Sequence, residues 1–195
     1  TWSESLARAL TSIGLGRDDV VQVGYGYGLF TGGLGLHYGA ERIGAAVLPV
    51  GTGNTERQIE LMQDLGTTAI ACTPSYFLHI MEVAEKMGIS IKKDTNLKAG
   101  IFGAEPWSLE TRKRIEDATG INAYDIYGTS EISGPLFTEC HAKKGIHVWA
   151  DMFLVEVLDP KTNEPVADGE TGELVFTTLH KFALPLIRYR IGDLS

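Results

Sequence analysis

The chain has 195 residues, of which 44% are hydrophobic and 22% charged, a composition typical of a globular protein with room for a sizeable core. Its net charge of −8 disfavours nucleic acid or an anionic membrane surface as the main partner, although local backbone amides can still bind a phosphate. Two cysteines, no apolar run of membrane-spanning length and no signal-peptide pattern predict a cytoplasmic protein rather than a disulfide scaffold or a membrane protein.

Helical and strand-like patterns alternate along the first two thirds of the chain. A helix is predicted for residues 2–13, with Ser3 as its N-cap and Gly14 as its stop. The glycines of residues 32–45 are spaced to let a helix press close against a neighbour. Strands alternating with helices predict a mostly parallel sheet flanked by helices, an α/β fold. The remaining predicted helices are 55–65, 75–87 and 108–119, and the strands are 19–23, 47–50, 68–72, 99–102 and 121–127.

The pattern changes after Pro135. Three β-like runs are separated by turn-rich segments, which predicts a smaller antiparallel β unit at residues 145–195 after an α/β unit at residues 1–144. Both ends of the chain break off abruptly, so we expect a piece of a longer protein. The three β-like runs are residues 145–149, 153–158 and 173–179.

The strand at residues 121–127 ends in two hydroxyl side chains and a carboxylate. Gly128 breaks the strand, and Thr129, Ser130 and Glu131 follow it directly. Open α/β sheets bind ligands at the carboxyl ends of their strands, so this tip would present all three side chains to one point. Oxygen donors of this kind suit a hard cation and a phosphate. An exposed turn is the simpler alternative if Gly-Thr-Ser-Glu is considered alone.

Two further segments could serve a ligand. Residues 103–106, Gly-Ala-Glu-Pro, follow a predicted strand and precede a helix cap, so they would lie on the same sheet edge as residues 128–131. Asp193 ends a β-like run, and an acid in such a place can accept both hydroxyls of a ribose. The simpler alternatives are a solvated loop around Glu105 and a surface salt bridge between Asp193 and Arg190.

Two other patterns point less clearly to a ligand. The glycines between Gly24 and Gly35 lack the G-x-G-x-x-G spacing from Gly24, and no acid closes the strand at 47–50, so a dinucleotide fingerprint is disfavoured. We expect close helix packing there. One cysteine beside two histidines matches no standard zinc spacing, which leaves a metal site and a buried free cysteine with surface histidines as alternatives. These residues are Cys140, His141 and His147.

The three strand-end segments resemble three core motifs of the adenylate-forming superfamily, which contains acyl-CoA synthetases and luciferases. They are residues 127–131, 103–106 and 189–193. Within that superfamily, the surrounding sequence is similar to the phenylacetate-CoA ligase family, and the similarity runs essentially from end to end. It is carried by residues 25–33, 53–58 and 184–190. The resemblance implies that the chain is part of the large N-terminal domain of an adenylate-forming enzyme.

The resemblance implies a two-step ligation of phenylacetate, or a related aryl acid, to coenzyme A. The carboxylate of the acid attacks the α-phosphate of ATP and gives an acyl-adenylate and pyrophosphate. The thiol of coenzyme A then displaces AMP to form the thioester. The resemblance thus implies ATP and coenzyme A as co-substrates and Mg²⁺ as the cofactor. It also implies a role in phenylacetate catabolism. A homodimer is a common assembly in the family.

Individual residues receive roles from the same resemblance. The catalytic residues would be Glu131, as the Mg²⁺ ligand, Ser130, as a hydrogen-bond partner of the α-phosphate, and Thr129 beside it. Tyr127 would stack on adenine, and Asp193 would hold the ribose. The full nucleotide-binding set would be Gly103, Ala104, Glu105, Pro106, Asp125, Tyr127, Gly128 and Asp193. The acyl pocket would be lined by Tyr76, Phe77, Ala104, Gly134 and Pro135.

Two parts of the family's pattern are absent from this sequence. A phosphate loop rich in serine, threonine and glycine would precede Thr1, and a small C-terminal domain with its lysine would follow Ser195. We therefore expect this chain alone to bind nucleotide weakly and to turn over little or nothing. A non-catalytic nucleotide-binding or interaction domain with the same fold is the main alternative. A nicotinamide oxidoreductase is disfavoured by the missing fingerprint.

Overall fold

The computed structural model describes residues 2–135 and 137–195, and the chain divides into two compact units at residue 147. The helices of the first unit are α1 (Trp2–Ser12), α2 (Thr31–Arg42), α3 (Thr55–Asp64), α4 (Pro74–Lys86), α5 (Ile91–Asp94) and α6 (Leu109–Thr119), with the 3-10 turn η1 (Ser130–Ile132). Its strands are β1 (Val20–Val23), β2 (Ala46–Leu48), β3 (Ala69–Cys72), β4 (Ala99–Gly103), β5 (Asn122–Tyr127) and β6 (Phe137–Thr138). The second unit contains β7 (Phe153–Leu158), β8 (Glu173–Thr178) and β9 (Tyr189–Leu194).

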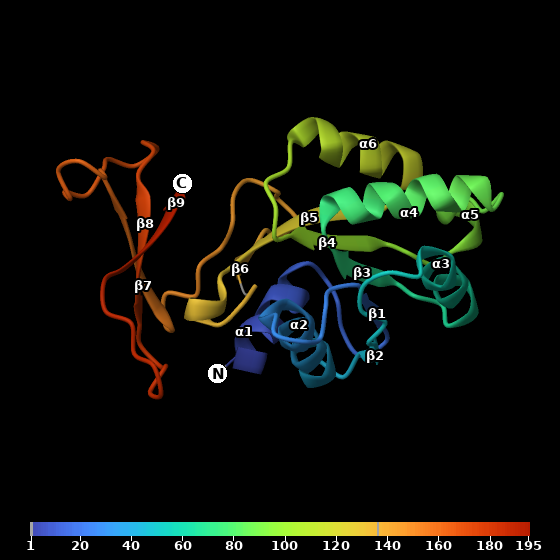
Figure 1. Cartoon of the computed structure of the whole chain (residues 1–195), viewed down its shortest axis with the longest axis horizontal. Helices are drawn as coiled ribbons and strands as arrows, with labels where there is room; N and C mark the ends of the chain where they lie inside the picture. Colours follow the sequence, from blue (N-terminus) through green and yellow to red (C-terminus); the bar gives the residue numbers. More distant parts are fainter. Residues whose placement is uncertain (1, 136) are drawn as a thin grey trace. The chain divides into compact units, whose positions relative to one another are not determined.

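The first unit is built around one sheet with the strand order β2-β1-β3-β4-β5-β6. Strands β1 to β5 run parallel, and β6 pairs antiparallel with β5. Helices cover both faces: α1 and α2 lie on one side of the sheet, and α4 and α6 on the other (Figure 1). The structure thus confirms the predicted α/β fold, a mostly parallel sheet flanked by helices.

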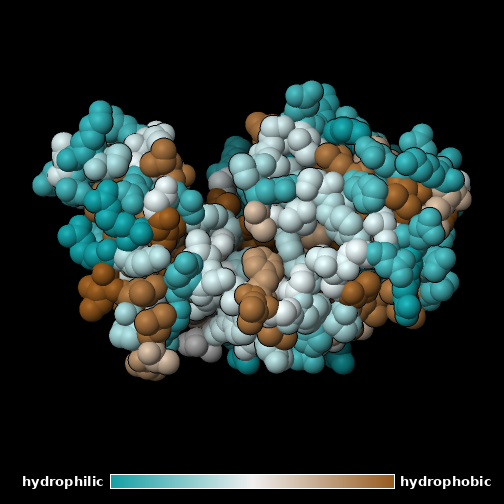
Figure 2. Space-filling view, viewed as in Figure 1, coloured by the Kyte–Doolittle hydropathy of each residue, from teal (hydrophilic) through white to brown (hydrophobic). Residues whose placement is uncertain are grey.

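The core on the α4 side is a continuous apolar cluster. Phe77 of α4 packs against Phe102 of β4 with ring centroids 5.0 Å apart, and Ile115 of α6 and Ile59 of α3 are fully buried in the same cluster. Burial of such side chains contributes about 1.5–3 kcal/mol each. The outer faces of α4 and α6 are largely hydrophilic in Figure 2. Amphipathic helices therefore build this layer.

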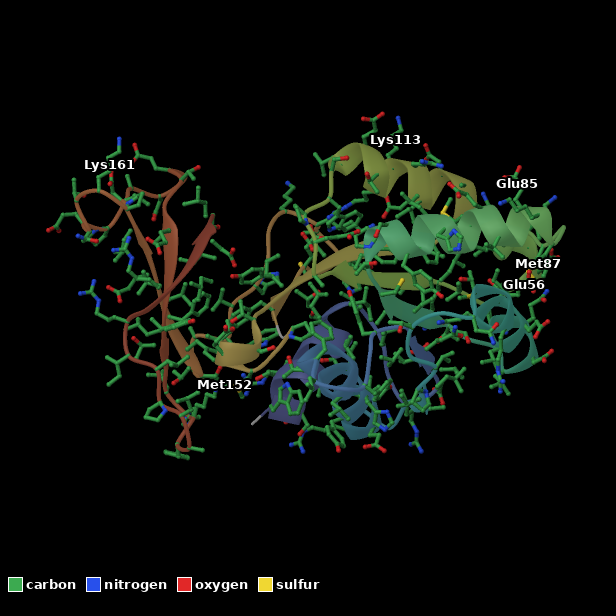
Figure 3. The ribbon with its side chains drawn as sticks, in the orientation of Figure 1. Glu56, Glu85, Met87, Lys113, Met152 and Lys161 are labelled. Carbon is green, nitrogen blue, oxygen red and sulfur yellow. The ribbon has the colours of Figure 1, made fainter. Side chains whose placement is uncertain are left out.

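Charged side chains mark the solvent side of the same helices. Glu85 of α4 and Lys113 of α6 are exposed and point away from the sheet (Figure 3). The ends of α6 follow the predicted capping: the Ser108 hydroxyl accepts the Thr111 N–H at 3.1 Å, and Gly120 closes the helix with φ +75°.

The glycines of α2 allow a close approach between helices, as the sequence predicts. A Cβ on Gly39 would lie 2.4 Å from Cβ of Leu6 in α1, and one on Gly35 would meet the Trp2 ring at 3.1 Å. Only glycine fits at Gly39 without a backbone shift. The expected helix packing is confirmed, and the packed neighbour is α1.

Two local predictions are corrected by the structure, and one short helix was not predicted. Ser3 is not an N-cap, because it lies inside α1, which already includes Trp2. Residues 145–149 do not form a strand; only His147 pairs, in an isolated bridge with Thr138, and Lys143 and Gly145 adopt positive φ that breaks extended pairing. Helix α5 is absent from the prediction, because one helical turn has too little periodicity to detect.

The second unit is a three-stranded antiparallel sheet, β7-β8-β9. This confirms the predicted antiparallel β character of the region. Phe153 and Phe176 are buried in it, whereas Phe182 and Ile187 are 88% and 79% exposed. Hydrophobic surface on this unit is visible in brown in Figure 2.

Within residues 2–135 and 137–195, no helix combines the length and the apolar character that a membrane crossing needs.

Candidate active site

The loops that follow the parallel strands gather at one edge of the first unit's sheet. Because β1, β3, β4 and β5 are parallel neighbours in register, their carboxyl ends meet there. The predicted segments 103–106 and 128–131 follow β4 and β5 directly. The topology therefore brings these two segments together, next to the segments that follow β1 and β3.

The tip after β5 folds tightly back on itself. A Cβ on Gly128 would lie 2.1 Å from the carbonyl oxygen of Gly134, and the Gly134 N–H donates to the Thr129 carbonyl at 2.7 Å. Ile132 is fully buried beneath the tip and anchors η1. The tip is thus a compact turn rather than an open loop.

The hydroxyl groups of this tip differ in their surroundings. The Ser130 Oγ lies 3.1 Å from the Thr31 Oγ1 at the first turn of α2. The Thr129 Oγ1 is buried and has no hydrogen-bond partner within the described part of the chain. A buried hydroxyl without a partner costs free energy unless a ligand or a water completes it. Glu131 is exposed on η1.

The segment after β4 is held in a strained conformation. Gly103 has no room for a Cβ, which would lie 2.1 Å from the Ile126 carbonyl oxygen. Ala104 has φ +67°, a left-handed conformation that costs about 1 kcal/mol for a residue with a side chain. Ala104 and Pro106 are exposed, while Glu105 is half-buried. The backbone of this segment is therefore presented to solvent at the sheet edge.

Tyr25, just after β1, ties two strand ends together. Its buried hydroxyl lies 2.7 Å from the Cys72 carbonyl oxygen and 3.2 Å from the Gly103 carbonyl oxygen. Burial raises the pKa of Tyr25 well above its ordinary value, so the hydroxyl keeps its proton and remains a donor. Tyr25 consequently fixes the end of β4 relative to β3.

A buried ionic network lies behind Asp125 in β5. The Glu139 carboxylate accepts the Asp125 N–H at 2.8 Å and pairs with Arg112 of α6, also at 2.8 Å. The Arg112 guanidinium stacks over the Trp107 ring, 5.0 Å from its centroid. A buried pair of this kind is costly to break, because either partner alone would be an uncompensated charge. The network holds the β5–β6 edge against α6.

The Asp125 carboxyl is half-buried above this network. Burial raises its pKa, an effect that the nearby Trp107 indole and the Arg112 charge only partly offset. The Trp107 Nε1 itself is buried and lacks a hydrogen-bond partner of ordinary geometry among the described residues. The neutral form of the Asp125 carboxyl is therefore more favoured in the folded protein than in water.

The five residues predicted for an acyl pocket have different environments. Phe77 is fully buried in the core cluster, so its side chain has no exposed surface with which to line a pocket. Tyr76 is half-buried, and its hydroxyl lies 3.3 Å from the Gly53 carbonyl oxygen. Gly134 is buried with φ +76°, Pro135 is half-buried and Ala104 is exposed. The acyl pocket stays a prediction, and the complete burial of Phe77 does not fit it.

The cysteine and histidine pattern does not assemble into a metal site in the described residues. No three histidine, cysteine or acidic side chains there form a cluster that could hold a metal ion. Cys140 is half-buried, and His141 and His147 are exposed. The His141 ring instead packs edge-on against Tyr124, with centroids 6.4 Å apart. The two histidines are thus surface side chains, and the cysteine is less buried than expected.

Asp193 lies in the second unit, within an irregularity of the β8–β9 pairing. The register shifts between Glu173 and Val175, and Gly192 adopts φ +82° at the same place. Such bulges re-aim side chains. Arg190 is engaged by Glu173, with Nε to Oε2 at 2.9 Å, and by Asn163. Asp193 therefore lies at a bulged end of β9.

Comparison with known proteins identifies the family. The family model described as "AMP-binding enzyme" matches residues 29–181. The chain belongs to the AMP-binding enzyme family.

Relatives with curated names are similar over the whole of this AMP-binding chain. It is 51% identical to the phenylacetate-coenzyme A ligase of Pseudomonas putida and 48% identical to that of Escherichia coli (strain K12), in both cases over 100% of the chain and 45% of the relative. The chain therefore spans less than half the length of the curated relatives it matches.

Solved structures of AMP-binding enzymes share the fold. A 2-hydroxyisobutyryl-CoA ligase in complex with 2-HIB-AMP and CoA superimposes with a TM-score of 0.94 at 30% identity, over 100% of this chain and 44% of that one. A benzoate CoA ligase from Burkholderia xenovorans LB400 has a TM-score of 0.73 at 16% identity, over 95% of this chain and 38% of that one. The second similarity shows the fold alone.

Several residues at this edge of the AMP-binding chain were missed by sequence reasoning. Tyr25, Thr31 and Ser75 each contact a strand-end segment through a hydroxyl. Their common signal is position: each follows the carboxyl end of a parallel strand. The Arg112–Glu139 pair gave no signal, because its partners are 27 residues apart and come from a helix and a strand end.

Proposed function

We propose that the whole protein containing this chain ligates phenylacetate, or a closely related aryl acid, to coenzyme A through an acyl-adenylate. The observation that carries the proposal is identity of 47–51% over the full length of this chain with proteins named phenylacetate-coenzyme A ligase. The complex of a structural relative with 2-HIB-AMP and CoA supports the same kind of chemistry. The corresponding biological role is phenylacetate catabolism.

The nucleotide would bind along the carboxyl edge of the sheet. We assign the adenine wall to the exposed backbone of residues 103–106, together with Asp125 and Tyr127. The Thr129 hydroxyl, which is buried and has no hydrogen-bond partner among the described residues, and the Ser130 hydroxyl would donate hydrogen bonds to the α-phosphate, where charge develops during attack. Asp193 would accept the ribose hydroxyls.

Glu131 is the proposed metal ligand. Mg²⁺ is commonly held by one or two carboxylates together with substrate phosphates rather than by a complete protein cage. An exposed Glu131 beside two hydroxyl residues, with no cluster of three ligating side chains in the described residues, fits a metal that ATP itself would complete. Bound Mg²⁺ would neutralise charge on the phosphates; the chain's part is to hold the carboxylate at the tip.

The acid would lie next to the adenylate. We assign its pocket to Tyr76, Ala104, Gly134 and Pro135, and leave out the fully buried Phe77. Two free cysteines support a reducing compartment, and we propose the cytoplasm. We further propose a homodimer, which the molar mass of the whole protein in solution would test.

The test is product formation by the whole protein with a panel of aryl acids. AMP and pyrophosphate should be released only when ATP, Mg²⁺, coenzyme A and a suitable acid are all present, with phenylacetate among the best acids. An absence of AMP release across the panel would reject the proposal.

A non-catalytic nucleotide-binding domain remains a second candidate, because a strand tip can bind nucleotide without turnover. Glu131→Gln separates the two functions. The enzyme proposal expects adenylation to fall by about a hundredfold or more, as for the loss of a metal ligand or charge stabiliser. The binding-domain alternative expects the behaviour of the whole protein to be unchanged.

A further inference from the structure

The Glu105 side chain bridges from the loop after β4 to the first turn of α4. Its Oε1 accepts the Ser75 N–H at 2.7 Å, and its Oε2 accepts the Ser75 hydroxyl at 3.0 Å. The first N–H groups of a helix have no partner within the helix, and the helix dipole favours a carboxylate there. One residue of α4 therefore engages both oxygens of Glu105.

The backbone of Gly103 and Ala104, just before Glu105, is strained. Ala104 adopts φ +67°, and Gly103 is pressed against the Ile126 carbonyl. Strained backbone persists only where the surroundings over-determine it. Here the Tyr25 hydroxyl holds the Gly103 carbonyl at 3.2 Å, and the link to Ser75 holds the other end. The two contacts bracket Ala104.

The first turn of α4 also contacts residues 53–55, at the start of α3. The Thr73 side chain caps the helix by accepting the Tyr76 N–H at 3.3 Å. The Tyr76 hydroxyl lies 3.3 Å from both the Gly53 carbonyl oxygen and the Thr55 Oγ1. A change at Glu105 would thus be transmitted to Tyr76, the residue next to Ser75.

We propose that Glu105 is a positioning residue whose link to Ser75 fixes the adenine wall against the acid wall. It rests on the proposed function, because residues 103–106 and Tyr76 are the walls that this function assigns. Glu105 belongs to the adenine wall through its backbone, whereas its side chain contacts neither substrate. Both carboxylate oxygens of Glu105 accept hydrogen bonds from Ser75 of α4. Its effect on the binding of ATP and of the acid therefore passes through the backbone and through Ser75.

Steady-state kinetics of the whole protein with Glu105→Ala test the link. The KM values for ATP and for the acid should both rise by about tenfold, as expected for the loss of a charge-assisted hydrogen bond, while kcat changes less than threefold. Glu105→Gln should restore most of both KM values, because its amide oxygen still accepts the Ser75 N–H. Glu85→Ala, which changes an exposed acid of α4 far from the link (Figure 3), serves as the matched control.

Ser75→Ala completes a double-mutant cycle. It removes the 3.0 Å hydroxyl contact but keeps the backbone N–H, so its effect should be smaller than that of Glu105→Ala. The double variant should be no worse than Glu105→Ala alone, since both changes remove the same interaction. Additive effects, a rise of only one KM, or KM values within twofold of wild type in Glu105→Ala would each overturn the proposal.

ATP affinity measured by calorimetry keeps this test separate from the proposed function. If the wild-type protein released no AMP with any acid, the proposed function would fail, but the link would still predict about tenfold weaker ATP binding in Glu105→Ala. Unchanged ATP affinity would overturn it. If Glu105→Ala failed to fold, Glu105→Gln and Ser75→Ala would carry the same comparison, with Ser75→Ala the weaker binder of the two.

Discussion

The strand tip after β5 depends on the absence of a side chain at Gly128. A side chain there would overlap the backbone: its Cβ would lie 2.1 Å from the Gly134 carbonyl oxygen and 2.8 Å from the Pro135 Cα. Backbone atoms cannot move aside as the end of a flexible side chain can. The tip that carries Thr129, Ser130 and Glu131 is therefore closed only because residue 128 lacks a Cβ.

Gly128→Ala should open this tip. We expect ATP affinity of the whole protein to fall by roughly tenfold, a loss of about 1.4 kcal/mol, within the range for overpacking. Gly28→Ala is the matched control, because a Cβ at residue 28 would meet no atom within 4 Å. Isothermal calorimetry with ATP measures both variants. Equal affinities for the two variants would contradict the role given to Gly128.

The burial of Asp125 makes the stability of the folded protein depend on pH. Burial raises its pKa in the folded protein, so its neutral form is favoured by folding. Stability from this group is present below the ordinary aspartate pKa of about 3.9 and is lost as the pH rises through the higher folded value. Asp125→Asn removes the titration with little change in shape.

Thermal unfolding of the whole protein between pH 3 and pH 7 measures this effect. The Asp125→Asn variant should gain stability relative to wild type as the pH increases over that range. At the acid end, where the carboxyl is neutral in both states, the two proteins should differ least. A constant difference across the range would show that Asp125 does not titrate with a raised pKa.

At the scale of elements, α1 and α2 pack through glycine. Gly39 lies against Leu6 so closely that a Cβ would approach the Leu6 Cβ to 2.4 Å. A Cβ on Gly35 would lie 3.1 Å from the Trp2 ring, where a side chain can shift. The two positions therefore differ in what an added methyl group would displace.

Gly39→Ala and Gly35→Ala should have different effects on the free energy of unfolding. Alanine gains about 1 kcal/mol of helix propensity over glycine, but overpacking at Gly39 costs about 1–3 kcal/mol and more where backbone must move. We expect a net loss for Gly39→Ala and a value near zero for Gly35→Ala. Urea denaturation of the whole protein compares them, and equal losses would argue against specific α1–α2 contact at Gly39.

Elements were predictable because their signals are local. The Ser108 cap and the Gly120 stop bound α6 within a few residues of the predicted helix, and the strand at 121–127 differs from β5 by one residue. The failure at residues 145–149 has a non-local cause, since a strand needs a pairing partner and apolar residues alone do not create one. Boundaries therefore follow from sequence where a cap or a glycine fixes them.

Side-chain contacts within the candidate site were less predictable. The strand-end segments could be found because each follows an apolar run, but Ser75 and Glu105 are 30 residues apart and Thr31 and Ser130 are 99 apart. No spacing rule joins such pairs before the sheet order is known. The core position of Phe77 was missed for a similar reason, because its burial depends on Phe102 in a neighbouring strand.

At the scale of the whole molecule, the chain is an α/β unit and a small antiparallel unit of an AMP-binding enzyme. It spans 44–45% of the length of its curated relatives. Activity is therefore a property to measure on the whole protein, and the strand-tip residues can be tested only there.

The exchange of labelled pyrophosphate into ATP by the whole protein tests the central claim most directly, because it reports adenylate formation without the thioester step. We predict exchange that requires both Mg²⁺ and phenylacetate or a related aryl acid, and that falls by about a hundredfold or more in Glu131→Gln. Exchange that is absent with every acid, or that is equally fast in Glu131→Gln, would contradict the account.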